Sequence, residues 1–325
     1  MAADLRLVAI GGGWIVPHHL AALDRLGRTT LVGVASAREE RAAAIATPRG
    51  ARASADPIRL VDELRPDVAI VCVPPFAAAG IGLGLVERGI PFLIEKPLAA
   101  ADPGGARRLG VAIAAAGLVV AVGYHLRGLE ALAEVREHLR DDPPRFVTGR
   151  WLDGTPAPAW WHRFDRGGGQ VIEQATHLYD LARHLVGEAV VVAAVSTRSE
   201  PADPPDADVA DATAAILRFE AGALGTFLNS RRFARPTIDL ELASAARRAT
   251  IRKAEGGQGA WEIVLAEDRS SRTVPSGRDP YEAQAERFVD AVEARDPGRV
   301  LSGYADALRT DELTRAVVAA TGQSG

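Results

Sequence analysis

The feature that most constrains the fold of this chain is an alternation, repeated along its first third, of short apolar runs with longer alanine-rich segments. Short runs rich in β-branched residues are typical of strands, and the alanine-rich segments favour helices. Strands that alternate with helices require right-handed crossovers and form a parallel sheet. Because the runs are almost wholly apolar, we expect helices on both faces, as in a doubly wound α/β sheet. The expected strands are Leu5–Ile10, Leu31–Ala35, Val68–Val73, Phe92–Ile94 and Leu118–Val122.

The pattern changes after about Gly123. Two helical stretches, Leu129–Leu139 and Gln174–Val186, precede consecutive runs with strand character, which predicts an α+β unit with an antiparallel sheet. A length of 325 residues also favours two domains, which we place at residues 1–122 and 123–325. The expected strands of the second domain are Val190–Ser196, Thr213–Phe219, Ala223–Phe227, Thr237–Leu242 and Arg248–Arg252, and the expected closing helices are Tyr281–Ala294 and Tyr304–Ala320.

Composition and charge exclude several classes of protein. The chain is 47% hydrophobic and 25% charged, which are ordinary proportions for a globular protein and not for a fibrous or disordered one. Its net charge is −4 and its basic residues are scattered, so nucleic acid is not an expected partner. Cys72 is the only cysteine, so it has no intrachain partner for a disulfide, and a reducing cytoplasm is the expected location.

Two uncharged stretches are candidates for membrane spans, and both are interrupted. Val68–Val86 is interrupted by Pro74 and Pro75, and Leu109–Tyr124 is short and interrupted by Gly117. The first residues of the chain carry no basic region, and the apolar run that follows them is too short for a signal-peptide core. We therefore expect neither a membrane partner nor secretion.

A glycine-rich turn follows the first expected strand. Gly11 and Gly13 match two positions of a GxGxxG dinucleotide-binding turn, and Val16 stands at the third. Such a turn lets the backbone approach a pyrophosphate, while Trp14 and Ile15 lie where the next helix presents its N–H donors. The motif alone leaves open a purely structural strand-to-helix turn.

The end of the second expected strand bears on the choice of cofactor. An acidic residue about 20 positions after the glycine turn usually binds the ribose hydroxyls of NAD. Ser36 stands there instead, followed by Arg38, and a hydroxyl with a nearby guanidinium suits the 2′-phosphate of NADP. We therefore expect NADP(H) in preference to NAD(H), with NAD(H) possible. The alternative is that Arg38 only begins a solvated helix.

The residues Glu95, Lys96 and Pro97 follow the expected strand Phe92–Ile94. They lie at the carboxyl edge of the sheet, where ligands bind in open α/β folds. A lysine there can hydrogen-bond a substrate oxygen and stabilise negative charge on it. A surface lysine in a turn is the alternative.

These motifs, taken in order, resemble the Gfo/Idh/MocA family of NAD(P)-dependent oxidoreductases. The resemblance implies an N-terminal Rossmann domain and a C-terminal α+β domain with a large open, mostly antiparallel sheet, along nearly the whole chain. The residues that carry it are Gly11–Gly13, Glu95–Lys96–Pro97, Gly123–Tyr124–His125–Leu126–Arg127, and the stretch from Gly167 to Asp180 that reads GGGQVIEQATHLYD.

The resemblance implies three catalytic residues. Lys96 matches the lysine beside the nicotinamide and the reacting hydroxyl, and His177 matches the histidine that acts as general acid or base. Glu173 stands where most relatives have aspartate. On one continuous helix, Glu173 and His177 would be four residues apart and would face the same pocket.

Further contacts are implied for cofactor and substrate. Glu95 and Pro74 would contact the cofactor. Relatives often carry a histidine a few residues after the proline that matches Pro74, and this chain has none there, so the packing would be apolar. Tyr124, Arg127 and Trp161 would contact the substrate. Core or subunit-contact roles for Trp160 and Trp161, and structural roles for arginines such as Arg163, Arg231 and Arg232, are the alternatives.

The resemblance implies hydride transfer between nicotinamide C4 and a secondary alcohol or ketone carbon of a sugar, cyclitol or related polyol. It also implies a homodimer or homotetramer formed through the C-terminal sheet. Two alternatives stay open: an NAD-dependent glycoside hydrolase that oxidises its substrate transiently, and a non-catalytic regulatory protein that binds a dinucleotide. No metal is expected, although Glu173, His177, Asp180 and His184 have spacings that a metal site also shows.

Overall fold

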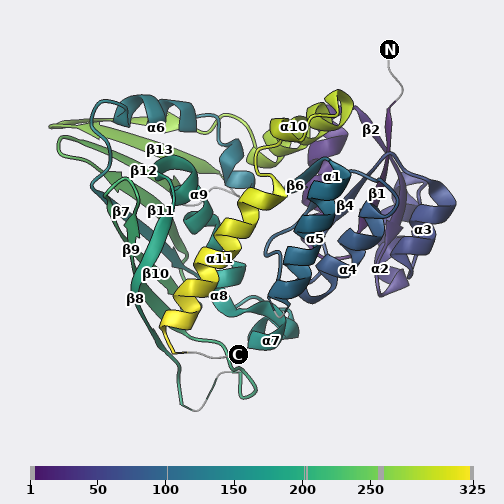
Figure 1. The fold of residues 1–325 in the computed structure, drawn as a ribbon, viewed down its shortest axis with the longest axis horizontal. Helices are drawn as coiled ribbons and strands as arrows, with labels where there is room; N and C mark the ends of the chain where they lie inside the picture. The colour runs from purple at the N-terminus through teal and green to yellow at the C-terminus, as the bar shows by residue number, and fades with distance from the viewer. Residues whose placement is uncertain (1–3, 101, 201, 203, 255–259, 323–325) are drawn as a thin grey trace. The chain divides into compact units, whose positions relative to one another are not determined.

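The computed structural model describes residues 4–100, 102–200, 202, 204–254 and 260–322. By their internal contacts the residues form two compact units (Figure 1). The first unit contains Met1–Gly128 and Pro280–Leu308, and the second contains Leu129–Asp279 and Arg309–Gly325. The boundary near residue 122 stays a prediction for the functional domains, and each unit is described by itself.

The first unit is built on a six-stranded parallel sheet with the strand order β3-β2-β1-β4-β5-β6. The order reverses between β1 and β4, whose residues pair as Ala9 with Ile70. Because all six strands are parallel, their carboxyl ends meet at one edge of the sheet. The strands are β1 Leu5–Ile10, β2 Thr29–Ala35, β3 Arg52–Ser54, β4 Val68–Val71, β5 Phe92–Ile94 and β6 Val120–Val122.

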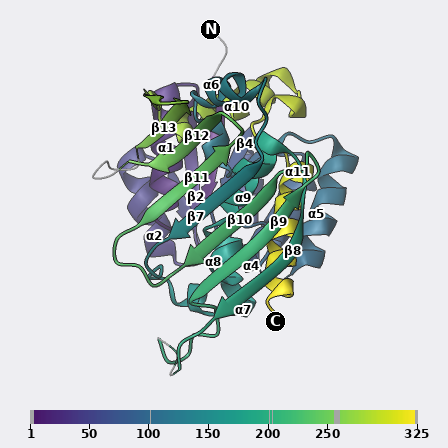
Figure 2. The ribbon, with the colours of Figure 1, turned by 90° about the vertical axis from the view of Figure 1, so that its left-hand side faces the viewer.

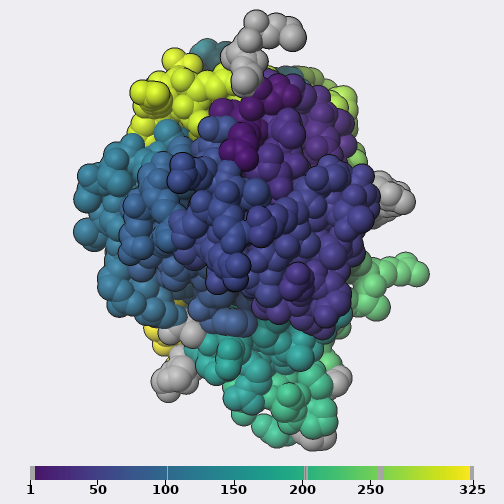
Figure 3. Space-filling model, turned by 90° about the vertical axis from the view of Figure 1, so that its right-hand side faces the viewer, coloured from purple at the N-terminus to yellow at the C-terminus, as the bar shows by residue number. Residues whose placement is uncertain are grey.

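Helices cover both faces of this sheet, which confirms the predicted doubly wound architecture. Successive side chains of a strand point to opposite faces, so Ala9 packs with α1, α2 and α10, whereas Ile10 packs with α3, α4 and α5. Figure 3 shows a continuous surface formed mostly by the first 120 residues. The helices are α1 Ile15–Leu26, α2 Glu39–Ala46, α3 Pro57–Leu64, α4 Pro75–Val86, α5 Pro103–Ala116 and α10 Pro280–Ala294, with the short helices η1 Thr47–Arg49, η2 His125–Gly128 and η4 Pro297–Arg299.

The second unit is built on an eight-stranded sheet with the order β14-β13-β12-β11-β7-β10-β9-β8. Within this sheet, β7 and β10 are the only described strands that pair in parallel, so the predicted mostly antiparallel sheet is confirmed. The strands are β7 Phe146–Leu152, β8 Ala189–Thr197, β9 Ala212–Phe219, β10 Leu224–Ser230, β11 Thr237–Ala243, β12 Arg247–Lys253, β13 Trp261–Glu267 and β14 Ser270–Pro275.

One face of this sheet is buried under helices. Phe227 of β10 lies over Gly149 of β7, where a Cβ would come within 2.6 Å of the phenyl ring. The ring stacks on Tyr179 at 4.3 Å between centroids, which joins the sheet to α9. The helices of this unit are α6 Leu132–Leu139, η3 Ala159–His162, α7 Phe164–Gly167, α8 Gly169–Glu173 and α9 Thr176–Val186, and α11 Tyr304–Ala320 ends in it.

The other face is turned toward the viewer in Figure 2, where no described helix crosses strands β7 to β10. Large apolar side chains stand exposed on these strands, including Val195 at 68% and Ile216 at 47%. The members of this apolar face are Phe146, Val190, Val192, Val195, Ile216, Leu224 and Leu228.

Sequence patterns located most elements but missed four strands. β3 is three residues long, and its Arg52, Ala53 and Ser54 carry no apolar run. β7 interrupts its apolar residues with Thr148, Gly149 and Arg150, and neither β13 nor β14 is among the strands expected from the sequence. No helix in the described part of the chain has both the length and the apolar character that a membrane span needs.

Candidate functional site

The glycine turn after β1 has two positions that only glycine fits. Gly11 has φ +141°, and a Cβ there would lie 2.8 Å from the carbonyl carbon of Cys72. A Cβ at Gly12 would lie 2.6 Å from the Ser36 hydroxyl, whereas Gly13 has open space around it. The steric requirement therefore falls on Gly11 and Gly12, and Gly13 remains free to face a ligand.

The turn leads directly into helix α1. Trp14 stands at its N-cap with 72% of its surface exposed, and Ile15 begins the helix. Val16, at the third position of the motif, is fully buried against the sheet, so it packs where a glycine usually lies. Exposed N–H groups at this end of α1 suit an anionic phosphate.

Ser36 and Arg38 follow β2 beside this turn. The Ser36 amide donates a hydrogen bond to the carbonyl of Ser54, and its hydroxyl accepts one from the Arg38 amide at 3.4 Å. Arg38 itself is exposed. The gap between Gly12 and Ser36 is so narrow that a Cβ at Gly12 would fill it. The Ser36 hydroxyl and the Arg38 guanidinium suit the ribose end of a dinucleotide.

Glu95 and Lys96 follow β5 at the same edge of the sheet. Glu95 is 9% exposed; its Oε1 lies 2.7 Å from Nε2 of the buried His19 in α1, and its Oε2 accepts the Lys96 amide at 3.2 Å. Lys96 is half-buried. The Glu95 side chain therefore binds protein groups, and a contact with the cofactor stays a prediction.

The charge on Glu95 is stabilised in spite of its burial. Burial acts to raise the pKa of this carboxyl, but the hydrogen bond from His19 and the charges of His19, Lys96 and His125 together hold the pKa below its ordinary value. The carboxylate also rests on Gly123, where a Cβ would lie 2.7 Å from it.

His125 interacts electrostatically with Glu95, although the sequence predicts no role for it. Its ring stacks on Tyr281 of α10 at 4.2 Å and 12°, and Tyr281 meets His19 edge to face at 5.3 Å. Burial lowers the pKa of His125 to about 4, while the Glu95 charge opposes the shift. The signal was present in the GYHLR motif, in which only the neighbours of His125 were chosen.

Tyr124 and Arg127, on either side of His125, both contact other groups of the first unit. Tyr124 is 1% exposed and packs in the apolar core of the first unit. The Arg127 guanidinium forms an ion pair with Asp306 at 2.6 Å and donates to the carbonyl of Leu301. Pro74 is the N-cap residue of α4, and Phe76 in the first turn of that helix is half-exposed; apolar packing of the cofactor against this segment stays a prediction. Substrate contacts of Tyr124 and Arg127 stay predictions.

His177 lies in the second unit at the start of α9. It is 6% exposed, and its imidazole stacks nearly parallel on the indole of Trp151 from β7, with 5.8 Å between centroids. Trp151 was not selected from the sequence, because β7 was not recognised as a strand. The stack fixes the plane of the ring that the family resemblance assigns to proton transfer.

Glu173 is held by Trp161. The buried indole of Trp161 donates a hydrogen bond of 2.7 Å to the Glu173 carboxylate. The expectation of one continuous helix through positions 173 and 177 is wrong, because α8 ends at Glu173 and α9 begins at Thr176. The amides of the next two residues both donate to the Gln170 carbonyl, which ends α8.

The remaining polar residues of this segment bind one another. Asp180 accepts the Thr310 hydroxyl at 3.0 Å, and Arg183 donates to that hydroxyl at 2.6 Å and to Glu188. His184 pairs with Arg136. Throughout residues 4–322, gaps aside, no group of three or more His, Cys, Asp or Glu side chains is placed to hold a metal ion.

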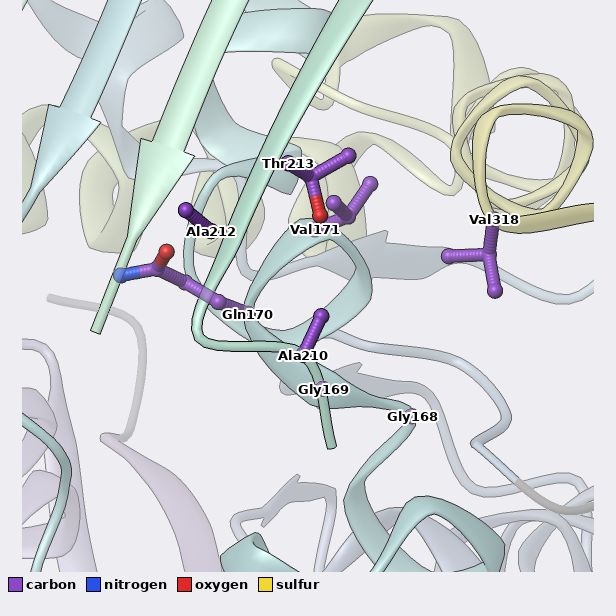
Figure 4. A pocket seen from close by; sticks show the side chains of 8 residues that line it. All are labelled: Gly168, Gly169, Gln170, Val171, Ala210, Ala212, Thr213 and Val318. Carbon is purple, nitrogen blue, oxygen red and sulfur yellow. The ribbon is translucent and has the colours of Figure 1, made fainter. Parts of the chain in front are cut away.

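Two further features of this unit concern the glycine run and the arginines. Gly168 and Gly169 both have positive φ and border a small cavity, whose lining is shown in Figure 4. Arg231 is 1% exposed and pairs with Asp211 at 2.5 Å, and Arg163 pairs with Asp208 at 3.3 Å. These two arginines stabilise the loop before β9.

Comparisons with known proteins match both units. Residues 5–124 match an oxidoreductase family with an NAD-binding Rossmann fold, and residues 142–252 match the Gfo/Idh/MocA C-terminal domain. The chain belongs to the Gfo/Idh/MocA family of oxidoreductases. It is 25% identical over 207 residues to inositol 2-dehydrogenase 4 of Saccharopolyspora erythraea, a match that covers 62% of this chain and 60% of that protein.

Solved structures share the fold of this family member. A levoglucosan dehydrogenase in complex with NADH and levoglucosan has a TM-score of 0.86 at 21% identity, covering 98% of this chain and 97% of the other. A 3-ketoreductase from Actinomadura kijaniata in complex with NADP and TDP-benzene has a TM-score of 0.84 at 20% identity, covering 98% of both chains. At such identities the likeness concerns the fold.

Proposed function

We propose that this Gfo/Idh/MocA protein transfers a hydride between nicotinamide C4 of NADP(H) and a secondary alcohol or ketone carbon of a sugar, cyclitol or related polyol. The observation that carries the proposal is one sheet edge that gathers the glycine turn after β1, Ser36 after β2 and Lys96 after β5. This edge includes the point between β1 and β4 where the strand order reverses, which is where open α/β sheets bind ligands. The inositol and levoglucosan dehydrogenases among the similar proteins support a polyol substrate.

The residues of the first unit would bind the cofactor and polarise the substrate. Gly11, Gly13, Trp14 and Ile15 would hold the pyrophosphate at the start of α1. The nicotinamide supplies the acceptor or donor of the hydride when it is bound. The ammonium of Lys96 would hydrogen-bond the reacting oxygen and stabilise the negative charge that develops on it.

The residues of the second unit would move the proton and hold the substrate. His177 would take the hydroxyl proton during oxidation and return it during reduction. Glu173, fixed by the Trp161 indole, would orient or tune this transfer. This assignment predicts that loss of either residue lowers kcat more than it raises KM.

The preference for NADP(H) over NAD(H) is part of the proposal. The Ser36 hydroxyl beside the glycine turn and the exposed Arg38 support it, since both suit a phosphate on the adenosine ribose. A location in the cytoplasm is also proposed, from the single cysteine.

Fluorescence titration with NADPH and NADH at one salt concentration tests this cofactor assignment. We expect NADPH to bind at least about tenfold more tightly, a difference of about 1.4 kcal/mol. The substitution Arg38→Ala should remove most of that difference. As a control, Arg49→Ala changes an exposed arginine that pairs with Asp24, and it should keep the difference. Tighter NADH binding would refute the preference, and binding of neither nucleotide would refute the proposed function.

The apolar face of the second sheet supports a homodimer or homotetramer. Apolar side chains gathered on neighbouring strands are typical of an interface between protein copies. The seven residues of this face lie on β7 to β10, and a second copy of the chain is the proposed occupant.

A further inference from the structure

A large aromatic side chain stands exposed beside the glycine turn. Trp14, the N-cap residue of α1, has 72% of its surface exposed, although tryptophan is on average a well-buried residue. Phe76, in the first turn of α4, is 45% exposed. These two residues follow β1 and β4, the neighbouring strands between which the strand order reverses. Exposed aromatic surface therefore borders the point where open α/β sheets bind ligands.

The glycine turn has two sides. A Cβ at Gly12 would lie 2.6 Å from the Ser36 hydroxyl and 2.9 Å from the Cβ of Arg41, so this side of the turn faces the end of β2 and helix α2. In the sheet, β2 and β5 lie on opposite sides of β1, and so do Ser36 and Lys96 that follow them. A dinucleotide with its adenosine ribose at Ser36 and its pyrophosphate at the turn would extend its nicotinamide half toward β4 and β5.

Ring contacts connect the Trp14 indole with this second side of the turn. The indole meets the imidazole of His18 edge to face, with 5.4 Å between centroids, and His18 stacks on Tyr281 of α10 at 6.2 Å. Tyr281 meets His19 edge to face at 5.3 Å, and His19 lies 2.7 Å from the Glu95 carboxylate after β5. The row of rings therefore leads from the glycine turn toward the end of β5, and away from β2.

The indole is held at one edge and remains open over most of its surface. Its contact with His18 restrains its orientation, and a group that is already oriented loses little conformational entropy when a ligand covers it. An aromatic face suits a flat ring and also attracts a cation, whereas a pyrophosphate needs N–H donors or positive charge. The nicotinamide is a flat ring and is cationic when oxidised, so it is the part of the cofactor that this surface fits.

We propose that the Trp14 indole packs against the nicotinamide half of the bound dinucleotide, while the backbone at the start of α1 serves the pyrophosphate. The side chain and the backbone of this segment then bind different parts of one ligand. The inference rests on the proposed function, because it requires that the glycine turn binds a dinucleotide. Its own content is that loss of the indole weakens binding of the whole dinucleotide and spares the adenosine half.

Isothermal titration calorimetry of the intact protein with NADPH and with adenosine 2′,5′-bisphosphate tests the inference. The second ligand carries the adenosine half of NADPH and lacks the nicotinamide half. We expect Trp14→Ala to weaken NADPH binding by about tenfold, an effect typical of removing a stacking aromatic side chain, and to leave the Kd of the fragment unchanged. If the wild type binds NADH more tightly than NADPH, NADH and AMP replace this pair of ligands.

Two further variants control the titration. Trp14→Phe keeps an aromatic face and should retain most of the affinity for NADPH. Val111→Ala removes apolar surface at a residue of α5 that is 71% exposed, and should change the binding of neither ligand. Unchanged binding of the fragment by Trp14→Ala shows that its glycine turn is intact, so that a weaker affinity for NADPH is not a consequence of unfolding.

Hydroxyl-radical footprinting of the wild type gives a second readout that depends on no variant. Peptide mass spectrometry follows the oxidation of Trp14 relative to that of Val111, in the free protein and in its complexes. Saturating NADPH should lower this ratio by at least about threefold, because an indole covered by a ring exposes little surface. Saturating adenosine 2′,5′-bisphosphate should leave the ratio near that of the free protein.

The outcomes separate this inference from the proposed function. Either an unchanged Kd for NADPH in Trp14→Ala or an unprotected Trp14 in the NADPH complex overturns the inference and leaves the proposed function standing. Equal weakening of NADPH and of the fragment also overturns it, because the indole would then support the turn as a whole. A wild-type protein that binds neither NADPH nor NADH refutes the proposed function and this inference together.

Discussion

His125 couples the stability of the first unit to pH. Its ring is buried against Tyr281, and burial lowers its pKa to about 4 from an ordinary value of 6.5. The unfolded chain therefore binds a proton at this residue between pH 6.5 and 4, while the folded chain does not. The stabilisation is complete above pH 6.5 and is lost as the pH falls toward 4.

This shift predicts a difference between variants in acid. Between pH 7 and 5, the contribution of His125 to the free energy of unfolding should fall by about 2 kcal/mol. Urea unfolding of His125→Asn should show a loss over this range smaller by that amount than the loss of the wild type. His18→Asn, an exposed histidine of α1, should lose as much as the wild type does. Equal losses in His125→Asn and the wild type would contradict a buried neutral His125.

At the level of single residues, motifs predict catalytic roles for Lys96 and His177, and those roles stay predictions. The contacts of His19, His125 and Trp151 were not predicted from the sequence. Their contacts join segments far apart in the chain, such as positions 19 and 95, and no local pattern reports such a meeting. Trp161 is predicted to contact the substrate, but its indole N–H donates a hydrogen bond to Glu173, so the substrate contact stays a prediction.

At the level of elements, apolar periodicity was a good guide for buried strands and a poor one for edges. β1 and β5 agree with their predicted bounds, because buried strands of parallel sheets are apolar throughout. β3 and β14 are edge strands, and edge strands carry polar side chains that hide their pairing. The break between α8 and α9 was missed because the local sequence has no proline or glycine at that point.

The turn between β1 and α1 gives a prediction at this scale. Gly11→Ala should lower the free energy of unfolding by about 1–3 kcal/mol, because the residue has φ +141° and no room for a Cβ. Gly13→Ala should leave stability nearly unchanged, since nothing lies within 4 Å of its Cβ position. Urea unfolding of both variants checks this. Equal stability of the two variants would show that the turn relaxes without cost.

At the level of the whole molecule, the order of motifs was enough to predict the family. It did not predict which segments of the chain make up each unit. Residues Pro280–Leu308 return to the first unit, where Phe288 and Val289 of α10 pack on the sheet beside α1. Sequence patterns identified α10 as a helix but had no means to place it with the first third of the chain. Long-range packing of this kind depends on complementary surfaces that periodicity does not record.

The proposed second copy on the apolar sheet face can be tested by sedimentation. Ile216→Glu with Leu228→Glu introduces charges at two positions of that face that are 47% and 42% exposed. We expect wild-type dimers or tetramers to dissociate into folded monomers in this variant. Val111→Glu, which changes a 71% exposed residue of α5, should leave the assembly intact. A wild-type chain that sediments as a monomer would contradict the proposed interface.

The central claim is hydride transfer that depends on the Lys96 amine, and absorbance at 340 nm tests it most directly. Wild type, Lys96→Ala and Lys253→Ala are compared with NADP⁺ or NAD⁺ on a panel of inositols, hexoses and glycosides. We predict that at least one polyol reduces the cofactor, that Lys96→Ala lowers kcat/KM by about 100-fold or more, and that Lys253→Ala has no effect. Equal rates in Lys96→Ala and the wild type, or sugar release from a glycoside without accumulation of reduced cofactor, would contradict the account.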